Sequence, residues 1–92
     1  NYSVYSSGVE GKHFIQVKDF KTKETTLYKG KVWPGICAFP DFMKDSTRQW
    51  WSGLCKNFLL EYNVDGLWND MNEPAIFESP TVTMDLSATH LD

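Results

Sequence analysis

The feature that most limits the fold of this chain is a short apolar run that becomes polar at its end. Val64–Trp68 is followed at once by the polar residues Asn69 and Asp70, and then by Pro74, which cannot donate to a β-ladder. Active sites of α/β enzymes form at the carboxyl ends of strands, where polar groups follow a buried strand. The sequence therefore predicts an α/β fold with Asp70 at the end of a strand.

The helix before this run is predicted from the spacing of its apolar residues. Ser46 and Gln49 have the spacing of a capping box, which would start the helix, and the helix is expected to end near Tyr62. Asp41 and Asp65, on either side of it, are interpreted as loop and turn residues. The helix carries two adjacent apolar rows, Trp50, Leu54, Phe58 and Tyr62 in one, and Trp51, Cys55 and Leu59 in the other. This stripe should face a sheet, as in one αβ step of a barrel.

Two short strands are expected in the first third of the chain. Residues 13–17 and 25–28 are rich in β-forming side chains and flank a charged stretch, which predicts a β-hairpin. After Lys29 the chain is expected to turn, and the prolines at positions 34 and 40 predict an irregular loop that lasts until Phe42.

Four short motifs, each with tryptophan or proline, occur in a distinctive order. Residues 68–73, Trp-Asn-Asp-Met-Asn-Glu, resemble the nucleophile signature of glycoside hydrolase family 31, the retaining α-glucosidases and α-xylosidases, in which this run closes the fourth barrel strand. Residues 32–35, Val-Trp-Pro-Gly, residues 39–42, Phe-Pro-Asp-Phe, and the pair at positions 50 and 51 are similar in order and spacing to the family segment before that strand. The resemblance is strong over residues 31–77.

The resemblance implies a (β/α)8 TIM barrel. Such a barrel needs roughly 250 residues, and this chain has 92. Residues 1–92 are therefore expected to be a fragment of a single catalytic barrel domain. The fragment would include the fourth strand and the helix before it, together with an N-terminal β-hairpin-like insertion.

Two carboxylates lie close together in the signature run. By themselves Asp70 and Glu73 suggest the carboxylate pair of a retaining glycosidase, which stands about 5–5.5 Å apart, although an aspartate at a strand end is often only a turn or capping residue. The resemblance implies that Asp70 is the nucleophile, that the acid/base is an aspartate from a later strand outside this chain, and that Glu73 supports Asp70 through hydrogen bonds. It also implies that Trp33, Trp68 and Met71 line the sugar pocket. Core packing is the alternative for all three, and it is strongest for Trp68.

The implied activity is retaining hydrolysis of α-glycosidic bonds, with an α-glucosidase that releases glucose from the non-reducing end of an α-glucoside as the leading hypothesis. An α-xylosidase or an α-glucosyltransferase of the same family is the nearest alternative. A carbohydrate-binding or scaffold protein without catalysis is the alternative of another class. The resemblance implies no metal and no organic cofactor.

Composition and charge argue against several other classes. The net charge of −3, with thinly spread basic residues, argues against nucleic-acid binding. The sequence has no apolar run that could span a bilayer and no basic-then-apolar leader. Cys37 and Cys55 lack the spacing of a zinc site and the density of a disulfide scaffold, and are interpreted as small buried residues. His13 and His90 belong to no motif and are assigned no catalytic role.

Overall fold

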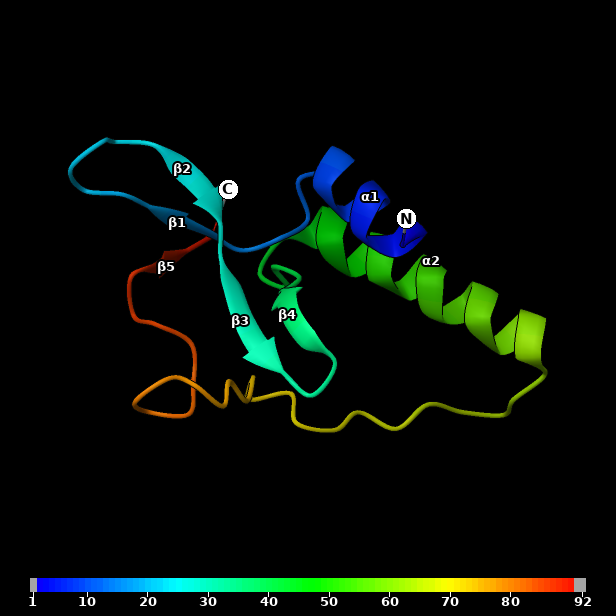
Figure 1. The fold of residues 1–92 in the computed structure, drawn as a ribbon. Helices are drawn as coiled ribbons and strands as arrows, with labels where there is room; N and C mark the ends of the chain where they lie inside the picture. The colour runs from blue at the N-terminus through cyan, green and yellow to red at the C-terminus, as the bar shows by residue number, and fades with distance from the viewer. Residues whose placement is uncertain (1, 91–92) are drawn as a thin grey trace.

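The computed structural model describes residues 2–90 as two helices and two small sheets (Figure 1). The elements in chain order are α1 (Ser3–Glu10), β1 (Gln16–Lys18), β2 (Thr25–Leu27), β3 (Lys29–Val32), β4 (Gly35–Ala38), α2 (Asp45–Tyr62) and β5 (Ala88–Thr89). Strand β1 lies between β2 and β5 in one antiparallel sheet, and β3 and β4 form a separate antiparallel pair.

The predicted β1–β2 hairpin is confirmed. Gln16 pairs with Leu27 in the ladder, and the Asp19 carboxylate accepts hydrogen bonds from the backbone N–H groups of Lys21 and Thr22 in the connecting turn. These bonds to the charged form lower the pKa of Asp19. The sequence does not predict strand β5, because two residues are too few to show the alternation of a strand. Strand β5 forms because Thr89 pairs with Gln16, a residue near the other end of the chain.

The prediction of an irregular loop after Lys29 is wrong as far as Ala38. Strands β3 and β4 pair in full register, and Trp33 and Pro34 form the two-residue turn between them. Pro34 lies where no ladder hydrogen bond is needed, and Gly35 has a φ of 126°, which glycine adopts without strain. A proline between two strands therefore connects them here instead of preventing them.

Helix α1 was not expected either, since its sequence has no clear helical period. It begins without a side-chain cap and is held by contacts with distant residues. Gly8 is buried against Phe14, where an added Cβ would lie 2.3 Å from the ring carbon Cζ. The Tyr5 ring stacks on Phe14 at 5.7 Å, and Trp50 of α2 donates its indole N–H to Ser7 Oγ at 3.1 Å. Tertiary packing, more than local propensity, stabilises this helix.

Helix α2 is confirmed, but the predicted capping box is wrong. The helix begins at Asp45, and its N-cap residue, Lys44, makes no side-chain capping bond. Asp45 places a negative charge in the first turn, where its interaction with the helix dipole stabilises the helix. Its carboxylate also accepts hydrogen bonds from Arg48 and Gln49. Asn63 ends the helix in the left-handed conformation. No helix within residues 2–90 is long and apolar enough to cross a membrane.

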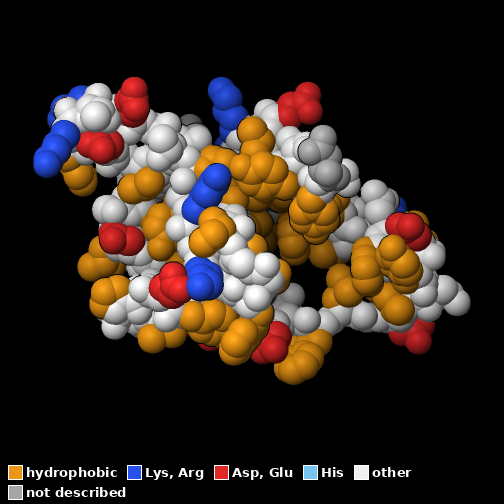
Figure 2. Space-filling model, viewed as in Figure 1, with side chains coloured by type: hydrophobic (Ala, Val, Ile, Leu, Met, Phe, Trp, Pro, Cys, Tyr) orange, Lys and Arg blue, Asp and Glu red, His pale blue; other side chains and the backbone are white. Residues whose placement is uncertain are grey.

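The strand predicted at Val64–Trp68 is not formed in this structure. Figure 1 shows this segment as an extended chain that leaves α2 and runs back toward the β3–β4 hairpin. Its backbone has no ladder partner within the part of the chain that is described, and a strand without a neighbour has no hydrogen bonds to hold it. Leu67 is 51% exposed, and Figure 2 shows an opening between this segment and the helix.

The apolar core is small for a chain of this length. Its buried hydrophobic residues in the described range are Phe14, Ile15, Ala75 and Ile76. The accessible surface is 7235 Å², whereas a compact monomer of this mass exposes about 5,500 Å². The radius of gyration is 14.4 Å, against about 12 Å for a compact domain of this length. Cys37 and Cys55 are free thiols that are half-buried, so their predicted full burial is wrong.

Candidate active site

A cavity of about 290 Å³ lies between the β3–β4 turn and the segment that follows Asp70. It is lined by Val32, Trp33, Pro34, Phe39, Asp70, Met71, Pro74, Ala75 and Phe77. Its volume is near the lower limit for ligand pockets, which begin at roughly 300 Å³. The fold thus brings three of the five predicted site residues, Trp33, Asp70 and Met71, to one cavity.

Trp33 lies at the tip of the β3–β4 hairpin and covers one side of this cavity. Its indole N–H donates to the Met71 thioether sulfur at 3.4 Å, and its ring centroid lies 4.4 Å from that of Phe77. The residue is nevertheless 80% exposed. An indole held by two contacts and otherwise open to solvent is available to a ligand, and it contributes little to the core.

Asp70 lies at the cavity edge, and the chain turns sharply directly after it. The Asp70 side chain is exposed and accepts no hydrogen bond from any residue between 2 and 90. Met71 has a φ of 56°, in the left-handed region that side-chain-bearing residues enter at a cost. This conformation sends the Met71 side chain and the residues after it back toward β3, where Met71 meets Trp33.

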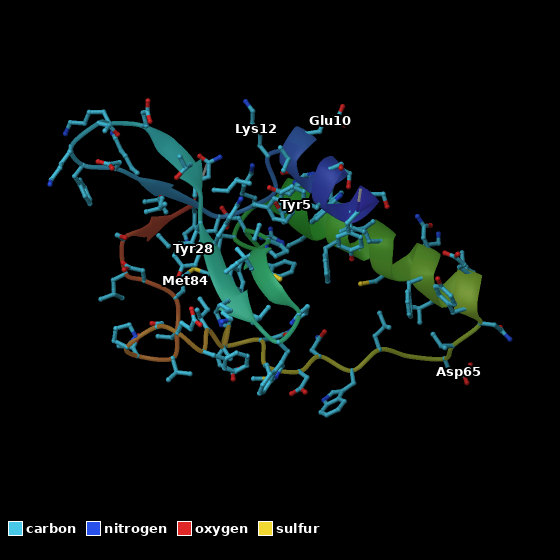
Figure 3. The ribbon with its side chains drawn as sticks, viewed as in Figure 1. Tyr5, Glu10, Lys12, Tyr28, Asp65 and Met84 are labelled. Carbon is cyan, nitrogen blue, oxygen red and sulfur yellow. The ribbon has the colours of Figure 1, made fainter. Side chains whose placement is uncertain are left out.

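The structure does not bring the other two predicted residues into the cavity. Trp68 is 86% exposed and is absent from the lining. Glu73 is exposed, and no hydrogen bond connects it to Asp70 within the described residues. Asp65, labelled in Figure 3, lies just beyond the end of α2 and away from the cavity, consistent with a turn residue. The roles of Glu73 and Trp68, like those of Trp33, Asp70 and Met71, therefore stay predictions.

The segment after Pro74 packs against β3 and closes the cavity on its far side. Phe77 donates its backbone N–H to the Lys31 carbonyl at 3.3 Å, and Lys31 Nζ lies 2.6 Å from Glu78 Oε1. Ile76 is buried over Gly30, where an added Cβ would lie 3.0 Å from Ile76 Cγ2. Sequence reasoning did not assign Phe77 to the site, although it ends the stretch of strong family resemblance.

The two histidines have partners that the sequence did not indicate. His90 Nδ1 forms a 2.6 Å hydrogen bond with Oδ1 of Asp41, a fully buried residue, and this bond connects the end of β5 to the loop before α2. His13 forms a 3.2 Å hydrogen bond with Thr47 and stacks on Trp50, and burial, followed by the charge of Lys44, lowers the pKa of His13. Neither histidine lines the cavity. Among the described residues no cluster of three or more His, Cys, Asp or Glu could hold a metal ion.

A larger groove of about 630 Å³ lies between α1, the β3–β4 hairpin and α2, and it is mostly apolar. It is lined by Tyr2, Val4, Tyr5, Phe14, Lys29, Ile36, Cys37, Ala38, Pro40, Trp50 and Trp51. Figure 3 labels Tyr5 where α1 meets α2, and Figure 2 shows hydrophobic side chains gathered over this part of the molecule. The groove has no carboxylate in its lining, so the smaller cavity is the site with reactive groups.

Comparison with known proteins matches nearly the whole chain. The sequence model of the glycosyl hydrolases family 31 TIM-barrel domain matches residues 1–91. The chain is 40% identical over 89 residues to alpha-glucosidase 2 of Bacillus thermoamyloliquefaciens, covering 97% of this chain and 10% of that protein. It is 44% identical over 77 residues to an alpha-glucosidase of Saccharolobus solfataricus, which covers 84% of this chain and 10% of that protein. It is 36% identical over 92 residues to neutral alpha-glucosidase C of Mus musculus, which covers 98% of this chain and 10% of that protein. The chain thus spans about a tenth of the length of these relatives.

Proposed function

The chain belongs to glycosyl hydrolase family 31, and from this membership we propose that it supplies the nucleophile of a retaining α-glucosidase. The observation that carries the proposal is the shared cavity of Asp70, Trp33 and Met71. This cavity is lined both by an exposed indole face and by a carboxylate that accepts no hydrogen bond from the described residues. Carboxylates flank the scissile bond in glycosidases, and an aromatic ring offers an apolar face to a sugar ring.

We further propose that residues 1–92 form part of one catalytic barrel domain, with Val64–Trp68 as its fourth strand and the β1–β2 hairpin as an insertion. The order β4, α2 and then Val64–Trp68 is that of a β-α-β crossover, whose strands are parallel and adjacent. The apolar groove beside β4 is consistent with this arrangement, because it leaves uncovered the face that the remaining strands of a barrel would cover. Pairing there would bring Trp68 and Asp70 to a common strand end.

In the proposed reaction an Asp70 oxygen attacks the anomeric carbon of an α-glucoside. The bond to the leaving oxygen breaks as the acid/base, an aspartate on a later strand, donates a proton to that oxygen. The covalent glycosyl-enzyme is then hydrolysed by a water molecule that the same aspartate deprotonates. Trp33, Met71 and Trp68 contact the sugar, and Glu73 orients the nucleophile or the neighbouring backbone. The reaction needs no metal or organic cofactor.

Kinetics of the complete enzyme with matched aryl glycosides test this proposal. We expect release of 4-nitrophenolate from 4-nitrophenyl α-D-glucoside, with the α-anomer of glucose as the first product, because double displacement retains configuration. Faster turnover of the α-xyloside would make the enzyme an α-xylosidase, and transfer of glucose to an added acceptor would make it a glucosyltransferase. Binding of the glucoside without turnover would support a carbohydrate-binding protein and contradict the proposal.

Trp33→Ala should lower kcat/KM by about tenfold or more and leave the melting temperature almost unchanged. The indole is 80% exposed, so its removal costs substrate contacts but little packing, whereas truncating a buried tryptophan costs about 3–5 kcal/mol of stability. Steady-state kinetics and a thermal melt of the same preparation separate the two effects. A large fall in melting temperature with unchanged kinetics would show that Trp33 belongs to the core.

A further inference from the structure

We propose that Phe77 is the positioning residue that holds the Trp33 indole over the cavity edge where Asp70 lies. This inference rests on the proposed function, because it concerns how the same cavity selects its sugar. The role is one of specificity: Phe77 acts on substrate through Trp33.

The contacts of Trp33 support this assignment. The Trp33 ring is mostly exposed, and its ring partner in the described part of the chain is Phe77, at a centroid separation of 4.4 Å and an interplanar angle of 48°. The Met71 sulfur accepts the indole N–H but is a weak acceptor, at the end of a flexible side chain. Contact between two aromatic rings is favourable and does not depend on the direction of one hydrogen bond. Phe77 is thus the firmer of the two restraints on the indole.

Phe77 can act as a restraint because its own backbone is anchored on both sides. Its N–H donates to the Lys31 carbonyl, the residue before it is buried over Gly30, and the residue after it pairs with Lys31. Lys31 belongs to β3, the strand that leads directly into the Trp33 turn. Phe77 and Trp33 are therefore fixed to the same strand, 44 residues apart in sequence, and the distance between their rings is set by the fold.

A double-mutant cycle in the complete enzyme tests the inference with 4-nitrophenyl α-D-glucoside as substrate. The variants are Phe77→Leu, Trp33→Ala and both together. We expect Phe77→Leu to lower kcat/KM about tenfold, mainly through a higher KM, with its melting temperature near that of the wild type. In the Trp33→Ala background the same change should alter kcat/KM less than twofold, because the indole that Phe77 restrains is already absent. Phe77→Met replaces Phe77→Leu in the cycle if the leucine variant does not fold.

Two further variants distinguish positioning from general packing. Phe77→Tyr keeps the ring and should retain kcat/KM within about twofold of the wild type. Phe20→Ala removes an exposed phenylalanine from the β1–β2 turn, far from the cavity lining, and should change neither activity nor stability. A Phe77→Tyr variant as impaired as Phe77→Leu would overturn the inference.

The outcomes also separate this inference from the proposed function. One outcome would overturn only the Phe77 inference. In that outcome the wild type hydrolyses the glucoside and Asp70→Asn is inactive, but the losses of Phe77→Leu and Trp33→Ala multiply in the double variant. If the wild type releases no 4-nitrophenolate, the proposed function fails and this inference falls with it.

Discussion

Asp70→Asn in the complete enzyme is expected to lower kcat on the order of 10⁴-fold or more while the protein still folds. Asparagine has nearly the shape of aspartate but cannot attack the anomeric carbon, so both the glycosylation and the deglycosylation steps are lost. The Asp70 side chain is exposed and makes no hydrogen bond within residues 2–90, so its replacement should leave the melting temperature almost unchanged. Kinetics with an aryl α-glucoside and a thermal melt measure the two quantities.

Asp65→Asn is the matched control for this variant. It makes the same chemical change at an exposed residue beyond the end of α2, away from the cavity, and should keep the wild-type kcat. Azide should restore more activity to Asp70→Gly than to Asp70→Asn, because only the glycine variant leaves space for a small anion beside the anomeric carbon. A folded Asp70→Asn variant with near-normal kcat would show that another group is the nucleophile.

Residues 1–92 expressed by themselves are expected neither to melt cooperatively nor to hydrolyse an α-glucoside. The chain exposes far more surface than a compact protein of its mass, and its described core has only four buried hydrophobic residues. Trp51, Phe58 and Tyr62 of the α2 stripe are exposed, and the strand expected at Val64–Trp68 has no partner in the described part of the chain. A barrel protects such edges and faces only when it closes.

Circular dichroism melts and a dye that binds exposed apolar surface measure the folding of this chain, with the complete enzyme as the reference. We expect a broad transition with strong dye binding and no release of 4-nitrophenolate. The proposed acid/base is not among these residues, so activity should be absent even in a preparation that retains α2 and the hairpins. A sharp two-state melt together with glucoside hydrolysis would contradict the fragment hypothesis and favour Asp70 and Glu73 as a self-sufficient pair.

Patterns within a few residues were predicted well from the sequence. The i+4 spacing of apolar residues predicted α2 and its end at Tyr62, and two β-rich runs around a charged stretch predicted the β1–β2 hairpin. The signature run identified the family and Asp70 as the candidate nucleophile before any contact was known, and the family is confirmed. Two predictions made from local patterns alone were wrong. The Ser46–Gln49 spacing does not form a capping box, and the two prolines do not exclude β3 and β4.

What the sequence by itself determined is the set of elements and motifs whose physical cause is local: helical period, strand alternation, and reactive residues in a fixed run. Only the tertiary structure decided which distant residues meet, as in the Asp41–His90 pair, the β1–β5 ladder and the contacts of Trp33 with Met71 and Phe77. These contacts join residues 38 to 73 positions apart. Their formation depends on the closure of long loops and on burial against neighbours. The exposed Val64–Trp68 segment follows the same rule, because its apolar pattern favours a strand, but only neighbouring strands can supply its hydrogen bonds.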